Sequence, residues 1–320
     1  MHSIKDSILF VGEAKDRLGD SNSIRIFDSC LNSLCTIYEA HSHAIIRIRP
    51  LFNGSLIGSC SKDFTVKIWN ISNLSAMAVQ TYTGHTDVVN DLTSLNDLTT
   101  MASVASASDD RTIQIWSITT GLKLNEIRTP NGPRYYCILL IQKFSLLASG
   151  DSYYQIRLYN INANFSLNKI LLGHTKPVTD LVLIDENTLA SSSQDTNIII
   201  WDLIGLVKIT TLVGHSSTVK TLSLMPFGNL LVSGSYDTTI RVWDVKNQIL
   251  LKNISAYSFN GVTTIAGSLN DEPYVFSGSS GLKDGLVKWN VLTGQTMLQY
   301  FDVKSRIGAL LLLESKSACK

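Results

Sequence analysis

Several features that would assign a function directly are missing from this chain. Charged residues make up only 17 % of its 320 residues, below the roughly 25 % of an ordinary soluble domain. Basic and acidic residues nearly balance, at 27 and 26, and no run of Lys or Arg forms the basic stripe that nucleic-acid binding needs. Composition therefore predicts no nucleic-acid partner.

Cysteine motifs, nucleotide motifs and long apolar runs are also lacking. The five cysteines include no CxxC pair, so neither a disulfide framework nor a zinc site is predicted. Gly278, Gly281 and Gly285 form no GxGxxG motif, and no Walker sequence occurs. No apolar run approaches the ~20 residues of a membrane helix, and the start has too short an apolar core for a secretory signal. We expect a reduced, intracellular protein, in the cytoplasm or the nucleus, without membrane insertion, metal or cofactor.

A repeated pattern of about 40 residues runs through the chain. Its clearest copies are residues 173–202 and 214–244, each of which opens with Gly-His and closes with Trp-Asp. Aligned on the closing aromatic residue, successive copies are about 42 to 47 residues apart. All five tryptophans of the chain fall in this one position, which is occupied by Phe27, Trp69, Trp116, Tyr159, Trp201, Trp243 and Trp289.

Each copy has the pattern of four short strands. In one copy, alternating or β-branched runs at 178–184, 189–193 and 197–201 are separated by clusters of Gly, Asn, Asp and Ser. This pattern is typical of antiparallel strands joined by tight turns. A fourth run at 207–212 leads to the next Gly-His. Little helix is predicted anywhere.

With this period and these Gly-His and Trp-Asp ends, the chain resembles the WD40-repeat family over nearly its whole length. The resemblance implies an all-β fold, a seven-bladed β-propeller of four-stranded antiparallel blades, with strands a to d running outward from the axis. A single domain, 1–320, is expected. Its repeats cover approximately residues 7–40, 41–83, 84–128, 129–172, 173–213, 214–255 and 256–301.

The two ends of the chain are incomplete in complementary ways. Too few residues precede the first copy to form its strand a, whereas residues 303–313 align with the strand a of other copies. We expect this last segment to join the N-terminal blade and close the ring, because closure removes an exposed sheet edge.

Four copies carry His, Ser, Asp and Trp at matching positions. A Ser-His-Asp hydrolase uses three of these residue types, but an active site has no reason to recur four times. A buried Trp needs a partner for its indole N–H, and a buried carboxylate needs several donors. In WD40 proteins the residues that these resemble form a hydrogen-bond chain within each blade. The members here are His41, Ser59, Asp63, Trp69, His85, Ser106, Asp110, Trp116, His174, Ser191, Asp195, Trp201, His215, Ser233, Asp237 and Trp243.

Three copies depart from this set. The fourth has Asn131 in the His position and Tyr153 in the Asp position. The seventh has Tyr257 for His, and its Asp284 is one residue out of register; the first has Ser21 in the Asp position. These blades have either drifted or acquired loops reshaped for a ligand.

If the four-residue sets hold the blades together, we expect partners to bind to the loops at the rim of the ring. In the WD40 family partners often dock on the face that carries the d–a and b–c loops. Arg and Tyr, which are common anchors of protein interfaces, occur there beside Lys, Asp and Phe. The resemblance places on this face Lys62, Asp87, Asp109, Arg134, Tyr153, Lys176, Gln194, Tyr236, Phe259 and Arg306.

The leading interpretation is a non-catalytic platform or scaffold that binds a peptide or a folded protein on this face. One alternative is a substrate-receptor or structural subunit of a larger complex, such as a ubiquitin ligase or a signalling assembly. Another is an enzyme with a site at the mouth of the central channel. Such an enzyme would need a non-repeating acid–base pair or metal cluster, and none is evident in the sequence. The partner and the oligomeric state are left open.

Overall fold

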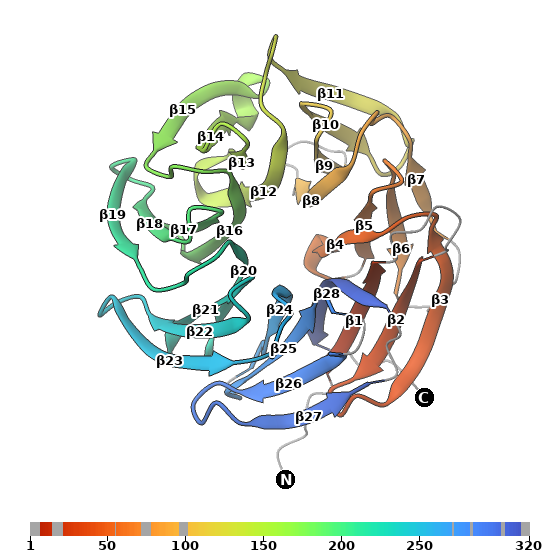
Figure 1. The fold of residues 1–320 in the computed structure, drawn as a ribbon. Helices are drawn as coiled ribbons and strands as arrows, with labels where there is room; N and C mark the ends of the chain where they lie inside the picture. Colours follow the sequence, from red (N-terminus) through yellow and green to blue (C-terminus); the bar gives the residue numbers. More distant parts are fainter. Residues whose placement is uncertain are drawn as a thin grey trace.

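Seven four-stranded antiparallel sheets stand around a central axis (Figure 1), which confirms the predicted seven-bladed propeller. The computed structural model describes residues 7–14, 22–54, 56–71, 78–95, 102–270, 272–281, 284–301 and 305–314. In blades two to seven the strands follow one another in sequence from the axis outward.

The first four blades have these strands. Blade one consists of β28 (Arg306–Glu314), β1 (Ser7–Ala14), β2 (Asn22–Asp28) and β3 (Ser33–His41). Blade two consists of β4 (Ile45–Leu51), β5 (Leu56–Ser61), β6 (Val66–Asn70) and β7 (Gln80–Tyr82). Blade three consists of β8 (Val89–Leu95), β9 (Ser103–Ser108), β10 (Thr112–Ser117) and β11 (Lys123–Arg128). Blade four consists of β12 (Tyr135–Ile141), β13 (Leu146–Asp151), β14 (Gln155–Asn160) and β15 (Ser166–Leu172).

The other three blades repeat the arrangement. Blade five consists of β16 (Val178–Asp185), β17 (Thr188–Ser193), β18 (Ile198–Asp202) and β19 (Val207–Leu212). Blade six consists of β20 (Val219–Met225), β21 (Leu230–Ser235), β22 (Thr239–Asp244) and β23 (Ile249–Ser255). Blade seven consists of β24 (Val262–Gly267), β25 (Tyr274–Ser279), β26 (Leu286–Asn290) and β27 (Thr296–Tyr300). Short 3-10 helices lie at η1 (Phe52–Gly54), η2 (Gln142–Phe144), η3 (Ile161–Ala163) and η4 (Phe227–Asn229).

The last strand closes the ring, as predicted. Strand β28 pairs antiparallel with β1, with Ile8 opposite Leu313 and Val11 opposite Leu310. The strand covers residues 306–314, where 303–313 was predicted, and residues 302–304 lie outside the described residues. Figure 1 shows the blue C-terminal strand beside the red N-terminal one, so that blade one is built from both ends of the chain.

Every innermost strand carries a β-bulge near its start, where one residue is passed over in the pairing with its neighbour. A bulge bends the strand locally and re-aims a side chain. Because the innermost strands line the axis, the seven bulges form a ring around one end of the channel. The bulged residues are Ile46, Asn90, Tyr136, Thr179, Lys220, Thr263 and Gly308.

The core lies between neighbouring blades. The closing aromatic residue of each repeat packs against the preceding blade. Trp116 of blade three, for example, stacks on Tyr82 of blade two with ring centroids 5.0 Å apart. Burying such rings is strongly favourable because the apolar area removed from water is large. The regular spacing of these aromatic residues in the sequence is therefore the spacing of the interfaces between blades.

Candidate functional site

Blade six brings its His, Ser, Asp and Trp into one chain of hydrogen bonds. The indole Nε1 of Trp243 donates to Ser233 Oγ at 2.8 Å, and the same oxygen lies 2.8 Å from His215 Nε2. His215 Nδ1 lies 2.7 Å from Asp237 Oδ2, which also accepts from the backbone N–H of Ser216 at 3.0 Å. The chain therefore runs from the blade interface to the loop that precedes the innermost strand.

Blades two, three and five contain the same chain. The Trp–Ser distances are 2.9, 2.9 and 2.8 Å, the Ser–His distances are 2.7, 2.7 and 2.8 Å, and the His–Asp distances are 2.9, 2.7 and 2.8 Å. The four serines are fully buried, so no substrate reaches their hydroxyls in this structure. They are Ser59, Ser106, Ser191 and Ser233.

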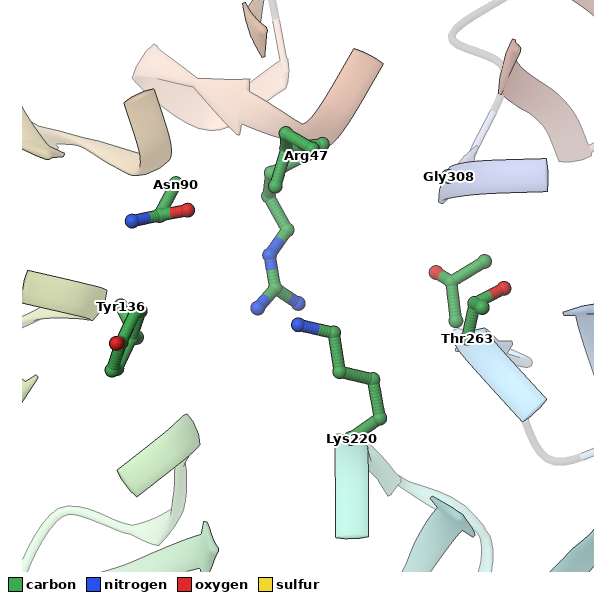
Figure 2. Close-up of a pocket in the computed structure, with 8 residues that line it drawn as sticks. Arg47, Asn90, Tyr136, Lys220, Thr263 and Gly308 are labelled. Carbon is green, nitrogen blue, oxygen red and sulfur yellow. The ribbon is translucent and has the colours of Figure 1, made fainter. Parts of the chain in front are cut away.

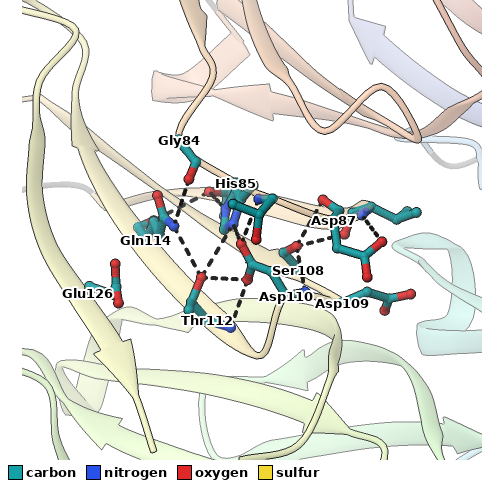
Figure 3. Close-up of polar contacts among 12 residues, drawn as sticks. Gly84, His85, Asp87, Ser108, Asp109, Asp110, Thr112, Gln114 and Glu126 are labelled. Atoms are coloured by element: carbon teal, nitrogen blue, oxygen red, sulfur yellow. Dashed lines mark hydrogen bonds and ion pairs between the residues drawn. The ribbon is translucent and has the colours of Figure 1, made fainter.

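Figure 3 shows how the chain continues into the loops of blade three. Asp110 accepts from the N–H of Thr112 at 2.9 Å and from its hydroxyl at 2.6 Å, and from the N–H of Thr86 at 3.1 Å. Burial alone would raise the pKa of Asp110, but hydrogen bonds from His85 and Thr112 outweigh it and lower the pKa to about 2. An ionised Asp110 thus ties the d–a loop to the b–c turn.

Two of the histidines in these chains are held in the neutral form. Burial lowers the pKa of His41 and of His215, and this exceeds the opposing effects of Asp63 and Asp237. A neutral imidazole can donate from Nδ1 to the carboxylate and accept at Nε2 from the serine hydroxyl. The serine oxygen then accepts the indole N–H.

Blade four has an acid where the alignment of the repeats indicated none. Tyr153 occupies the predicted Asp position, and its hydroxyl donates to the backbone oxygen of Asn131 at 2.7 Å. The acid is Asp151, two residues earlier at the end of β13. It accepts from the N–H of Tyr153 and Gln155 and from Arg157 Nε, at 2.9, 3.0 and 2.7 Å.

Blade seven replaces the histidine by a phenol. The hydroxyl of Tyr257 lies 2.8 Å from Ser277 Oγ, which also accepts from Trp289 Nε1 at 2.8 Å. Asp284 accepts a hydrogen bond from the Ser279 hydroxyl instead of from a histidine. The interior end of the chain is thus preserved with other residue types.

Blade one also has a buried acid. Glu13 accepts from the backbone N–H of Ser23 and from Arg25 Nε, both at 3.2 Å. Ser21, which the alignment put in the Asp position, lies outside the described residues.

The ten rim residues all belong to d–a or b–c segments. These two kinds of loop leave the sheets at the same end of the ring, because neighbouring strands are antiparallel; this end is called the loop face below. Asp87, Arg134, Lys176, Phe259 and Arg306 stand before or at the start of innermost strands. The b–c turns carry Lys62, Asp109, Tyr153, Gln194 and Tyr236.

Rim residues contact adjoining blades at two places in the described part of the loop face. Arg134 Nη1 lies 3.8 Å from Asp109 Oδ2, across blades three and four. Tyr236 of blade six packs against Gly261, because a Cβ at that glycine would lie 2.6 Å from the ring. Phe259, two residues before Gly261, is 92 % exposed, and Tyr236 is 46 % exposed. Two exposed aromatic side chains therefore occur where blades six and seven meet.

A cluster of charged residues in the central channel was missed in the sequence. Arg49 donates to Asp91 from Nε at 3.0 Å and from Nη2 at 2.9 Å, and Arg47 Nη1 lies 3.3 Å from Asp180 Oδ2. Burial disfavours ionisation of Asp91, but Arg49 and Arg47 outweigh it and lower its pKa. The available signal was a set of charged residues within innermost strands that are otherwise largely apolar.

The described residues contain no helix long and apolar enough to span a bilayer. Across the same residues, no three or more His, Cys, Asp and Glu side chains gather closely enough to hold a metal ion.

Comparison with known proteins agrees with the fold. The model of the family "WD domain, G-beta repeat" matches residues 32–70, 77–117, 165–202 and 206–244. Nuclear distribution protein PAC1 of Arthroderma benhamiae is 31 % identical over 251 residues, which are 65 % of this chain and 51 % of PAC1. WD repeat-containing protein RUP1 of Arabidopsis thaliana is 30 % identical over 186 residues, with 57 % and 47 % covered. Human Pre-mRNA-processing factor 17 is 26 % identical over 265 residues, with 79 % and 44 % covered.

This chain spans about half the length of the curated relatives it matches. Four repeats match the family directly, and the seven sheets form a closed propeller. The chain belongs to the WD40-repeat proteins.

Proposed function

We propose that this protein is a non-catalytic interaction platform that binds a peptide or a folded protein on the loop face. The observation that carries the proposal is the pair of exposed aromatic side chains, Phe259 and Tyr236, on loops that adjoin through Gly261. Aromatic residues are enriched in protein interfaces, and they bury a large area at small entropic cost. Arg134, exposed on the same face, adds a second common anchor residue.

Rigid loops support this role. In blades two, three, five and six an Asp in the b–c turn accepts the backbone N–H of the residue after the histidine, at 2.9 to 3.1 Å. Each of these bonds ties a d–a loop to a b–c turn. Loops that are ordered before binding lose less entropy when a partner docks.

In this proposal, the four Ser-His-Asp-Trp chains hold the blades together and perform no chemistry. Burial of the four serines favours this assignment over a hydrolase. The proposal includes a protein partner, no nucleic acid and an intracellular location. The near-zero net charge supports the absence of a nucleic-acid partner. The free thiols of Cys30 and Cys35 support the intracellular location.

Two quadruple variants, one on the loop face and one at the opposite end of the ring, test the proposal. The loop-face variant combines Lys62→Glu, Arg134→Glu, Tyr236→Ala and Phe259→Ala. The control variant combines Lys143→Glu, Leu122→Ala, Ile204→Ala and Leu292→Ala, whose positions lie in a–b and c–d loops at the opposite end of the ring. Quantitative affinity capture with crosslinking would measure the partners that each protein retains.

We expect the loop-face variant to lose, by a factor of about ten or more, partners that the wild type and the control retain. Both variants must first show the wild-type circular dichroism and unfolding temperature. Retention of all partners by the loop-face variant would contradict the proposal. Size-exclusion chromatography with light scattering then distinguishes a platform that acts alone from a subunit of a fixed assembly.

A further inference from the structure

A small cavity opens among the bulged residues of the innermost strands. Its wall includes Arg47, Asn90, Tyr136, Lys220 and Thr263, with Gly308 at one side (Figure 2). The bulges follow directly after the d–a loops, so the cavity lies at the loop-face end of the channel. A group presented by a partner on the loop face would meet this cavity first.

The two channel carboxylates are already fully engaged. Asp91 accepts two bonds from Arg49 and also the backbone N–H groups of Leu92 and Ile138, at 2.9 and 3.2 Å. Asp180 accepts the N–H groups of Leu181 and Leu222, at 3.1 and 3.0 Å, besides its arginine contacts. Neither carboxylate has capacity left for another strong donor.

Lys220 is the cation of the channel that has no hydrogen bond to either carboxylate. No described residue accepts a hydrogen bond from its ammonium group or forms an ion pair with it. Figure 2 shows the Lys220 side chain pointing toward the guanidinium of Arg47, so two like charges face each other. Burial, followed by the charge of Arg47, lowers the pKa of Lys220. Arg47 Nε is also buried without a hydrogen-bond partner, and Asp91 Oδ1 lies 3.6 Å from it.

The charge balance and the size of the cavity define what would fit. Among the described residues of the channel, three cations, Arg47, Arg49 and Lys220, face two carboxylates. The thiols of Cys60 and Cys137 stay neutral because burial raises their pKa. The excess is one positive charge. The volume that the centre of a water molecule can occupy in the cavity is about 30 Å³. A single bound water needs roughly 10–15 Å³ of volume measured in this way. That is room for about two waters, or for a carboxylate in their place.

We propose that this cavity is a carboxylate-binding site, in which Lys220 and Arg47 take one carboxylate group at the mouth of the channel. The group neutralises the excess charge and separates two cations that otherwise repel each other. A phosphate dianion is larger and would reverse the balance. The carboxylate comes from an Asp or Glu side chain of the docked partner. This assignment of its source rests on the proposed function.

Thermal unfolding of the full chain tests the site without a known partner. The probes are sodium acetate, sodium chloride and sodium phosphate at equal ionic strength and pH 7. A ligand that binds the folded state raises the unfolding temperature. We expect acetate to raise the midpoint of the wild type by about 2 °C or more beyond chloride. This acetate-specific rise should disappear in Lys220→Met and persist in Lys176→Met, a control at an exposed lysine of the loop face.

Two further readouts distinguish ligand binding from a structural role of Lys220. Without acetate, Lys220→Met should unfold at a higher temperature than the wild type, because it removes the uncompensated cation; a structural lysine predicts a lower one. A blocked peptide Ac-Gly-Asp-Gly-amide should reproduce the acetate effect, and Ac-Gly-Asn-Gly-amide should not. An acetate effect without a peptide effect would assign the site to a free monoanion and overturn the assignment to a partner.

The remaining outcomes separate this inference from the proposed function. An acetate effect that persists in Lys220→Met, or a phosphate effect larger than that of acetate, would overturn the site. If the loop-face variant loses its partners while Lys220→Met keeps them at unchanged affinity and acetate has no effect, only this inference fails. If acetate acts through Lys220 and the loop-face variant keeps every partner, the proposed function fails and the cavity binds a free carboxylate.

Discussion

Leu9 of β1 and Leu312 of β28 lie opposite each other in one antiparallel sheet, although they come from the two ends of the chain. Both side chains are buried in the cluster between blades seven and one. The pairing makes blade one a clasp, since the ring can close only when the last strand has found the first. Closure also leaves the inner edge of β1 covered, which removes a template for aggregation.

A methyl group at Gly308 should weaken this clasp. A Cβ at Gly308 would lie 2.0 Å from the backbone oxygen of Ile45 in the neighbouring blade, and backbone cannot move away as a side chain can. We expect Gly308→Ala to lower the free energy of unfolding by about 1–3 kcal/mol, measured by urea unfolding. The control is Gly205→Ala, where the nearest atom is an oxygen at the end of the partly buried Asp202 side chain. Equal effects of the two substitutions would contradict the closely packed clasp.

Removing a serine side chain that belongs to a hydrogen-bond chain should lower the free energy of unfolding more than removing a nearby serine side chain that does not belong to it. Ser233→Ala leaves the buried indole N–H of Trp243 and the Nε2 of His215 without their shared partner. We expect a loss of about 1–3 kcal/mol, the desolvation cost of an unsatisfied buried polar group. Ser216→Ala is the control, because Ser216 contributes only its backbone N–H. A loss no greater than that of the control would mean that the chain contributes nothing to stability.

Stability should fall in two stages as the pH is lowered. His41 and His215 have lowered pKa values in the fold, so below about pH 6.5 the unfolded chain binds protons that the folded chain does not, and stability begins to fall. Asp110, with a pKa of about 2, and Asp63, Asp195 and Asp237, also lowered, stabilise the fold above the ordinary carboxyl range. That contribution is lost as the pH falls from about 4 toward 2.

Urea unfolding at pH 7.5, 5.5 and 3.5 measures both stages. We expect the free energy of unfolding to decrease at each step. In Asp237→Asn the decrease between pH 5.5 and 3.5 should be smaller than in the wild type, because one lowered carboxyl is missing. An unchanged slope in that variant would show that Asp237 is not one of the groups responsible.

The channel cluster should behave as a set of mutually dependent charges. Asp91→Asn removes the main partner of Arg49, whose side chain is only partly buried, and we expect a loss of about 1–3 kcal/mol. Arg49→Met in the same chain removes the cation itself. We therefore expect the double variant to be more stable than Asp91→Asn alone in urea unfolding. If the two substitutions were additive, the pair would not be coupled, against the two hydrogen bonds of 2.9 and 3.0 Å that join them.

The architecture was accessible from the chain itself, because it rests on local patterns. The predicted run 207–212 is strand β19, and the predicted runs 189–193 and 197–201 differ from β17 and β18 by about one residue at their ends. Strand alternation and turn residues act over a few neighbouring residues, and the aromatic residue of each repeat fills the same blade interface. Seven repeats with complementary ends therefore implied seven sheets in a closed ring.

Other features required the tertiary structure. Asp151 in blade four and Tyr257 in blade seven make hydrogen bonds that other positions or residue types make in the regular repeats. Which side chain reaches a buried polar group depends on the path of the folded loop. The charged channel is the clearest case. Arg47 belongs to blade two, Asp180 to blade five and Lys220 to blade six.

By itself, the sequence determined the number of blades, their order and the closure of the ring, because each depends on contacts that recur with the period of the chain. Only the tertiary structure decided which non-repeating side chains meet at the axis. Each of these residues is a single departure within its own strand, and the electrostatic interaction among them exists only after the ring has brought distant strands within a few ångströms of one another.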